Sequence, residues 1–359
     1  MPMANKLSAE QLIQLKTDLA ERALELGFDM FGISDTSLEQ TGQQHQQWLA
    51  RHFHGDMDYM HKHGSKRWRP AELVPGTLSV ISVAMNYQPD ARAADEVLTD
   101  NSLAYISRYA LGRDYHKLVR NRLQKLAKFA EQQAGPYGYR VFCDSAPIME
   151  KPLAAKAGIG WTGKHSNLLN RQHGSWFFLG EIYTDMELPA DAAVTGHCGN
   201  CTSCIDACPT AAIVEPYVVD ARLCISYLTI EYKGSIPESL RPLVGNRIYG
   251  CDDCQLVCPW NRFAGTSPEA DFKPRHNLDN ISLLELFSWN EAKFLSRTEG
   301  SAIRRIGYEQ WKRNIAIALG NGDYNPETVQ ALRTCISDSG SRLVAEHCQW
   351  ALDRLAGKQ

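Results

Sequence analysis

The spacing of the cysteines is the feature that most constrains the fold of this chain. Eight of its 11 cysteines lie between Cys198 and Cys258. The first four follow the pattern Cys-x2-Cys-x2-Cys-x3-Cys-Pro, which ends at Pro209. Bacterial ferredoxins use this spacing to bind a [4Fe-4S] cluster with three thiolates, while the fourth cysteine ligates a second cluster. The spacing therefore predicts a second group of cysteines.

The second group is present further along the chain. The segment from Cys251 to Pro259 repeats the end of the pattern, and Cys224 supplies one more thiol. The crossed ligation of two-cluster ferredoxins divides the eight thiolates into two sets: Cys198, Cys201, Cys204 and Cys258 for one cluster, and Cys208, Cys224, Cys251 and Cys254 for the other. Structural zinc is the alternative, because CxxC pairs also bind zinc. The triple CxxCxxC run and the two Cys-Pro endings favour [4Fe-4S] clusters.

The cellular compartment decides how the cysteines are interpreted. In a reducing compartment disulfides are rare, so closely spaced cysteines indicate metal binding or redox chemistry. The N-terminal segment lacks the apolar core of a signal peptide, and no run of about 18 apolar residues occurs. We therefore expect a cytoplasmic protein that does not enter a membrane. The formal net charge of −3 gives no overall sign of nucleic-acid binding, so such binding must depend on local basic patches.

Helices and strands alternate in the first half of the sequence. Apolar residues at helical spacing predict helices at 12–26 and 114–133, and the continuous apolar run at 78–87 predicts a buried strand. This alternation predicts an α/β domain. No Rossmann glycine fingerprint and no P-loop occurs in the sequence. After Gly300 the pattern is helical to the end and predicts stacked helix hairpins.

Four parts of the sequence resemble the epoxyqueuosine reductase family. They are Ser107–Leu123, Cys143–Leu169, the cysteine block and Ile303–Asn321, in the order and spacing of the family. The resemblance implies three domains: an α/β cobalamin-binding catalytic domain at 1–190, similar to reductive dehalogenases and nitroreductases; a ferredoxin-type domain with two [4Fe-4S] clusters at 191–265; and an α-helical, HEAT-like tRNA-binding domain at 266–359.

The resemblance also implies a reaction. Enzymes of this family remove the epoxide oxygen of epoxyqueuosine at the wobble position of tRNA and give queuosine, the last step of queuosine biosynthesis. The implied cofactors are two [4Fe-4S] clusters and cobalamin, with electrons passing from the clusters to cobalamin. We further expect an external electron donor of the flavodoxin or ferredoxin type, and a monomeric protein.

Asp144 is the proton donor that the resemblance implies. It follows a strand-like run and precedes Ser145, at a point where a loop can display a side chain above a sheet. A carboxyl group kept neutral by an apolar pocket can act as a general acid toward the departing oxygen. The alternative is that Asp144 caps the helix predicted at 148–157.

The resemblance also implies the residues that contact cobalamin: Arg67, Ser107, Asp144, Leu168, Ser226, Asp252 and Asp253. Structural roles are the alternatives, namely a solvated charge pair of Arg67 with Arg69, core packing, a helix cap and turn residues. We expect no histidine to ligate the cobalt, and we assign structural or surface roles to His116, His165 and His173. Cys143, Cys335 and Cys348 are expected to be small core residues.

The tail carries the predicted tRNA contacts. Arg304, Arg305 and Arg313 are the expected phosphate contacts, and Tyr308 and Trp311 offer surface for base stacking. A solvated charged face is the alternative.

Three other functions compete with this interpretation. They are a cobalamin reductase acting on a small organohalide, an electron-transfer module that serves a partner enzyme, and a zinc-bearing RNA-binding protein. The basic tail argues against the first, and the long first domain argues against the second.

Overall fold

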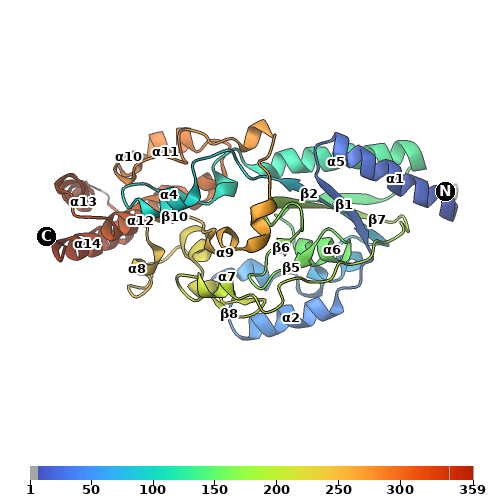
Figure 1. Ribbon diagram of the computed structural model, residues 1–359, viewed down its shortest axis with the longest axis horizontal. Helices are drawn as coiled ribbons and strands as arrows, with labels where there is room; N and C mark the ends of the chain where they lie inside the picture. Colours follow the sequence, from blue (N-terminus) through green and yellow to red (C-terminus); the bar gives the residue numbers. More distant parts are fainter. Residues whose placement is uncertain (1–6, 339, 359) are drawn as a thin grey trace.

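The computed structural model describes residues 7–338 and 340–358. The molecule is elongated, and the first helix, α1 (Ala9–Glu25), and the last helix, α14 (Arg342–Ala356), lie at opposite ends (Figure 1). No helix in the described part of the chain is long and apolar enough to cross a membrane.

A four-stranded sheet forms the centre of the first half of the chain. Its strands are ordered β1-β2-β7-β4, with the bounds β1 (Met30–Ser34), β2 (Ser79–Asn86), β7 (Phe177–Thr184) and β4 (Tyr139–Phe142). Strand β2 is buried along its whole length, as its continuous apolar run predicts. Neighbouring strands pair antiparallel. The predicted α/β layers are present, but the sheet is antiparallel, whereas alternating helices and strands usually form a parallel sheet.

Helices cover both faces of this sheet (Figure 1). Side chains of a strand alternate between its faces. Position 180 of β7 faces α5 (Tyr115–Ala134), where a side chain on Gly180 would collide with Val119 and Leu123. Odd-numbered residues of β7 face the other way, toward α6 (Glu150–Lys156), and Tyr183 packs there against Leu153. Helix α1 packs beside α5.

Short elements connect these parts. They are α2 (Glu39–Ala50), α3 (Pro70–Leu73), α4 (Ala94–Thr99), β3 (Tyr105–Ile106), β5 (Trp161–Thr162), β6 (Leu168–Leu169), α7 (Ser203–Asp206), β8 (Ile213–Glu215), β9 (Val218–Val219), α8 (Arg241–Val244), β10 (Arg247–Tyr249) and α9 (Asp253–Leu256). Strand β3 pairs with β10, which joins the first part of the chain to the cysteine block. The segment that follows Cys224 forms a π-helix at Tyr227–Glu231.

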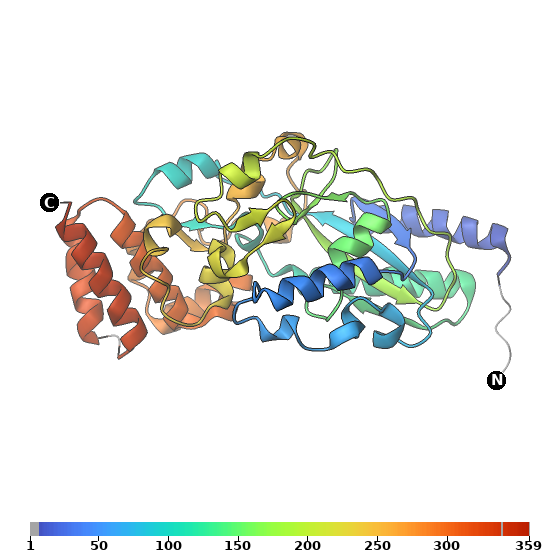
Figure 2. The ribbon, with the colours of Figure 1, turned by 90° about the horizontal axis from the view of Figure 1, so that it is seen from below.

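The tail consists of α10 (Leu283–Phe287), α11 (Glu291–Arg297), α12 (Gly307–Asn321), α13 (Pro326–Asp338) and α14. Helices α12, α13 and α14 lie side by side at one end of the molecule (Figure 2). Their apolar core continues into Ala104 and Ile106 of the first part and Ile248 of the cysteine block. Contacts therefore cross both predicted domain boundaries, and those boundaries and the HEAT-like character of the tail stay predictions.

Two tail residues are buried where the sequence suggested an exposed surface. Trp311 has no exposed area and lies 6.0 Å from Trp289, measured between ring centroids. Arg313 also has no exposed area, and its guanidinium donates to the backbone carbonyls of Leu228, Tyr232 and Gly234 at 2.7–2.8 Å. The predictions of base stacking for Trp311 and of phosphate contact for Arg313 are therefore wrong, because both side chains are used to pack α12 against the preceding segment.

Replacing Arg313 tests this packing role. The Arg313→Leu variant would remove the guanidinium donor from the carbonyls of Leu228 and Gly234 and one of two side-chain donors from that of Tyr232, so we expect the free energy of unfolding to fall by about 3 kcal/mol. Urea denaturation followed by circular dichroism measures the change. Arg304→Leu, at an exposed position of the same segment, is the control and should change stability by no more than about 0.5 kcal/mol. Equal effects of the two variants would contradict the assignment.

Candidate active site and cluster cavities

Two cavities divide the eight cysteines as their spacing predicts. A cavity of about 210 Å³ is lined by Cys198, Cys201, Cys204 and Cys258, and a cavity of about 430 Å³ is lined by Cys208, Cys224, Cys251 and Cys254. We call these groups the outer and the inner cysteine set. Each set surrounds a space, and among the described residues no three His, Cys, Asp or Glu side chains converge on a point where one metal ion could bind. The arrangement fits clusters of several atoms.

The outer set lies near the surface. Cys201 is exposed, and Cys204 and Cys258 are buried. Trp161 and Trp260 pack edge to face beside this cavity, with ring centroids 5.1 Å apart. The Lys164 ammonium donates to the carbonyls of Gly199 and Cys201 at 2.7 and 2.8 Å, so it fixes the loop that carries the first cysteines.

The inner cavity gathers most of the predicted cofactor contacts. Its lining includes five of the seven residues that the resemblance implies: Ser107, Leu168, Ser226, Asp252 and Asp253. The apolar part of the wall comes from Phe177, Phe178, Leu179 and Ile225. The cavity therefore offers a mostly apolar surface with a few polar groups, which is the usual character of a cofactor site.

The two aspartates of this wall are already engaged within the protein. The Asp252 carboxylate accepts hydrogen bonds from the Ser107 and Tyr105 hydroxyls, at 2.6 and 2.8 Å, and from a backbone N–H. Asp253 accepts from the Arg247 guanidinium at 2.7 Å and from the Cys251 thiol. These residues give the inner cavity its shape, and their predicted contact with cobalamin stays a prediction.

Arg67 does not line the inner cavity. It is 7% exposed, and its guanidinium donates to the carbonyls of Tyr59 and Lys62. The alternative of a solvated charge pair is wrong, because Arg69 is exposed and binds Glu39 instead. Arg67 holds the backbone of the 59–62 segment, and its contact with a cofactor stays a prediction.

Asp144 does not itself line the inner cavity, but it contacts the lining residue Tyr115, and we call Tyr115, His116 and Asp144 the rim of this cavity. The backbone of Asp144 is left-handed, with a φ of 55°, and its side chain is 52% exposed. Its Oδ2 atom accepts a hydrogen bond from the Tyr115 hydroxyl at 3.0 Å and lies 3.1 Å from His116 Nε2. Tyr115 lines the cavity and stacks on Phe178. The alternative of a helix cap is wrong, because the residue that precedes α6 is Met149.

The charges at this rim differ from the expectation of a neutral carboxyl group. Hydrogen bonds from His116 to Asp114 and Asp144 raise the pKa of His116 to about 9. The hydrogen bond from His116 lowers the pKa of Asp144, and burial raises it. The hydrogen bond has the larger effect, so the pKa of Asp144 lies below its ordinary value. At neutral pH the proton therefore lies on the imidazole, and the expectation that Asp144 is neutral is wrong. His116, which we assigned a structural or surface role, belongs to this site.

Sequence reasoning also missed buried polar groups around the cavities. His165 lines both cavities, and among the described residues its Nε2 atom has no hydrogen-bond partner. Burial lowers its pKa to about 4. Lys151 lines the inner cavity as well. Glu181 has no exposed area, and Glu150 accepts a hydrogen bond from the backbone N–H of Asp144. A glutamate inside the otherwise apolar strand of β7 was a signal that could have drawn attention to Glu181.

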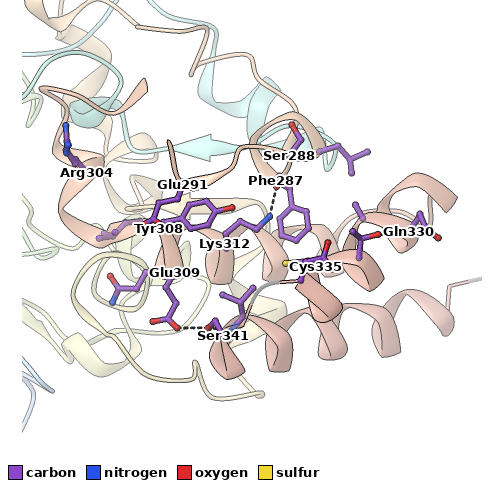
Figure 3. A pocket seen from close by; sticks show the side chains of 18 of the residues that line it. Phe287, Ser288, Glu291, Arg304, Tyr308, Glu309, Lys312, Gln330, Cys335 and Ser341 are labelled. Atoms are coloured by element: carbon purple, nitrogen blue, oxygen red, sulfur yellow. Dashed lines mark hydrogen bonds between the residues drawn. The ribbon is translucent and has the colours of Figure 1, made fainter. Parts of the chain in front are cut away.

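The predicted tRNA contacts that remain exposed lie beside a third cavity, in the tail. This cavity measures about 1370 Å³ and is lined by α10, α12, α13 and α14, with Arg304 at one edge (Figure 3). Arg304 is exposed, and Arg305 is paired with Glu231 at 2.7 Å. Tyr308 is half-buried and donates to the carbonyl of Trp289. Cys143, Cys335 and Cys348 are all buried as predicted, and Cys335 also borders the cavity.

Two family models match the chain. One, described as epoxyqueuosine reductase QueG, DUF1730, matches residues 67–145, and the other, described as a 4Fe-4S double cluster binding domain, matches residues 197–261. The second model confirms the prediction of two [4Fe-4S] clusters over structural zinc.

Solved structures with the same fold include enzymes of this kind. A crystal structure of an epoxyqueuosine reductase with an epoxyqueuosine-modified stem loop of tyrosine tRNA matches with a TM-score of 0.88 at 26% identity, covering 96% of this chain and 91% of that one. A structure from Bacillus subtilis, with its catalytic aspartate loop swung out of the active site, matches with a TM-score of 0.87 at 25% identity and the same coverage. A reductive dehalogenase matches with a TM-score of only 0.42, so that predicted kinship stays a prediction.

Curated relatives match along nearly the whole chain. The epoxyqueuosine reductase of Pseudomonas aeruginosa is 55% identical, covering 98% of both chains. That of Escherichia coli is 56% identical, covering 95% of this chain and 89% of its own. With the two cysteine sets and the cavities in place, these matches show that the chain belongs to the epoxyqueuosine reductase family of oxidoreductases.

Proposed function

We propose that this chain reduces epoxyqueuosine in the anticodon loop of tRNA to queuosine. The observation that carries the proposal is the inner cavity, where four cysteines meet an apolar wall and the rim holds Asp144 and His116. A non-catalytic electron carrier would have no use for such a rim. The curated relatives named above are epoxyqueuosine reductases that this chain covers over most of their length, and one solved relative holds an epoxyqueuosine-modified stem loop.

The inner cavity suits cobalamin in its chemistry. A corrin needs a broad apolar surface and scattered polar groups for its amide side chains, and the wall provides Phe177 and Leu168 together with Ser226 and Lys151. Cobalamin is larger than this cavity of about 430 Å³, so it would also occupy space outside it. When bound, the clusters supply electrons one at a time and cobalamin supplies a strongly reducing metal beside the substrate.

Asp144 and His116 would manage the protons. Converting the epoxide to an alkene consumes two electrons and two protons and releases water. His116 Nε2 holds a proton 3.1 Å from Asp144 Oδ2, and Asp114 accepts from the opposite ring nitrogen at 2.6 Å, which fixes the ring. We propose that Asp144 receives the proton from His116 and delivers it to the departing oxygen. In this proposal Asp144 is a carboxylate that obtains its proton from His116, and it is not a carboxyl group that is already protonated.

The loop that carries Asp144 would also move. It spans residues 143–149, between β4 and α6, and we call it the Asp144 loop. In the B. subtilis relative the catalytic aspartate loop swings out of the active site. The exposed side chain of Asp144 and its left-handed backbone are compatible with a loop that exchanges positions.

Arg304 and Arg305 remain the proposed phosphate contacts. Both are exposed, and both border the tail cavity. Arg305 belongs to the tail, whereas its partner Glu231 follows the inner cysteine Cys224 by seven residues. A phosphate that displaces Glu231 from Arg305 would therefore bring the substrate close to the inner cavity.

Electrons would enter at the outer cysteine set. In the described part of the chain its cavity is lined by Lys164 and Arg262 and by no acidic residue. Phe263, which also lines it, is 50% exposed. Such a surface suits an acidic carrier of the flavodoxin or ferredoxin type.

The reaction itself is tested on purified protein loaded with iron and cobalamin. Incubation with a chemical reductant and tRNA that contains epoxyqueuosine should convert the nucleoside to queuosine, which mass spectrometry of digested tRNA detects as the loss of one oxygen atom. Unchanged epoxyqueuosine with fully loaded protein would refute the proposed function.

Asp144→Asn should abolish turnover without removing the cofactors. The amide cannot pass a proton from His116, so we expect kcat to fall by about 10²- to 10⁴-fold, with iron content and cobalamin absorbance unchanged. Asp18→Asn, at a half-buried position on α1 far from the cavities, is the control and should retain full activity. Normal turnover in Asp144→Asn would remove Asp144 from the mechanism.

Arg304→Glu tests the tRNA contact. Loss of one phosphate contact should weaken tRNA binding several-fold and reduce the slope of log K against log salt by about 1. Fluorescence anisotropy of a labelled stem loop measures both. Arg22→Glu, on α1 at the far end of the molecule, is the charge-matched control. Equal weakening by both variants would indicate a general charge effect and not a contact.

A further inference from the structure

A short turn borders both cysteine sets. It covers residues 163–167 and joins β5 to β6, which pair antiparallel, and we call it the 163–167 turn. The N–H of Gly163 donates to the carbonyl of Asn167 at 2.8 Å, and Ser166 has a left-handed backbone with a φ of 64°. The turn is therefore tightly closed, and it contributes side chains to the outer and to the inner cavity.

Two lysines hold this turn in place. Lys164 donates to two carbonyls of the loop that carries the first outer cysteines. Lys151, which lines the inner cavity, donates to the carbonyl of Ser166 at 3.1 Å and to Asn167 Oδ1 at 3.0 Å. Because these contacts and the strand pairing fix the turn, its position does not depend on the ring of His165 alone.

His165 lies in the middle of the turn. It is 4% exposed, and of the described residues it alone lines both the outer and the inner cavity. Its Nδ1 atom accepts a hydrogen bond from the backbone N–H of Asn167 at 3.1 Å. A backbone N–H can only donate, so Nδ1 carries no hydrogen, and the neutral ring carries its hydrogen on Nε2.

The Nε2–H group of His165 is a buried donor, and it has no acceptor in the described part of the chain. Such a donor costs free energy unless something in the space that it borders accepts from it. The surroundings of Gly163 indicate which space this is. A Cβ atom at position 163 would lie 3.2 Å from His165 Nε2 and 2.7 Å from Leu169 Cδ1. Leu169 lines the outer cavity and not the inner one, so Nε2 lies on the side of the outer set.

We propose that His165 Nε2–H donates a hydrogen bond to a sulfur atom of the [4Fe-4S] cluster held by the outer set, and that this bond raises the reduction potential of that cluster. Hydrogen bonds to the sulfurs are one of the means by which a protein sets the potential of a cluster. Reduction adds one electron to the cluster while the histidine keeps its proton. The reduced cluster is more negative, so it accepts the hydrogen bond more strongly than the oxidised cluster does.

This role differs from that of a metal ligand. An Nε2 atom that carries hydrogen has no free lone pair, so His165 donates to the cluster and does not ligate iron or cobalt. A higher potential would let the outer cluster take electrons from an external donor more readily. That consequence for electron delivery rests on the proposed function, whereas the hydrogen bond itself does not.

His165→Phe and His165→Gln form a matched pair of variants. Phenylalanine keeps the shape of the ring without the donor, and glutamine keeps an N–H donor near the position of Nε2. An EPR-monitored redox titration of iron-loaded protein measures the potential of each cluster. In His165→Phe the reduction of one cluster should become about tenfold less favourable, which for one electron is a fall of about 59 mV. In His165→Gln it should stay within about threefold of wild type.

Solvent exposure identifies the cluster that is affected. A soluble paramagnetic ion accelerates the spin relaxation of a cluster near the surface, and Cys201 of the outer set is exposed. The cluster whose potential falls in His165→Phe should be the one whose relaxation this ion accelerates more. A fall confined to the other cluster would overturn the assignment to the outer set.

A spectroscopic signature separates the hydrogen bond from a general effect on packing. Pulsed EPR of the reduced protein labelled with ¹⁵N-histidine should show a nitrogen coupling that disappears in both His165 variants. His197 also lines the outer cavity, so the comparison with the variants, and not the presence of a coupling, identifies His165. His165→Gln keeps the donor and loses the label, so it decides the contact even where His165→Phe fails to assemble its clusters.

His173→Phe, at a half-buried position that lines neither cavity, is the control and should keep the wild-type potentials and the ¹⁵N coupling. Unchanged potentials in His165→Phe, or a full ¹⁵N coupling in His165→Gln, would overturn the proposal. Neither measurement uses tRNA. A protein that fails to reduce epoxyqueuosine would therefore refute the proposed function and leave the test of His165 intact.

Discussion

The crossed use of the cysteines is the constraint on which the rest of the structure depends. Each cavity takes cysteines from both ends of the cysteine block: Cys258 joins the outer set, and Cys208 joins the inner set. Helices α7 and α9 must therefore lie against each other, as they do. The inner cavity also takes residues of β6 and β7, so placing the cysteines correctly places the sheet, the apolar wall and the rim at Tyr115 as well.

Carboxyl groups close to one another carry opposite protonation states in this site. Asp144 is half exposed and is held as a carboxylate by His116, whereas Glu181 is sealed in an apolar layer and favours the neutral form. Environment alone makes this difference.

The sequence was most informative where local pattern decides structure. The cysteine spacing predicted both sets, and the apolar run of β2 predicted a buried strand. It was least informative where tertiary contacts decide. Arginine in a helix is usually exposed, and burial of Arg313 becomes favourable through tertiary acceptors, the carbonyls of Leu228, Tyr232 and Gly234, together with Asn314 Oδ1. The charge on Asp144 depends on His116, which is 28 residues away in the chain.

Helix α12 does more than present a surface at the end of the molecule. Asn314 donates to the carbonyls of Thr229 and Ile248, and Asn321 donates to those of Arg241 and Gly245. Side-chain amides of α12 thus satisfy backbone carbonyls in the segment between Cys224 and Cys251, although α12 comes later in the chain than both cysteines. A chain that ended before α12 would therefore lose more than substrate affinity. The segment between Cys224 and Cys251, which forms part of the wall of the inner cavity, would lose the hydrogen bonds that hold its backbone in place.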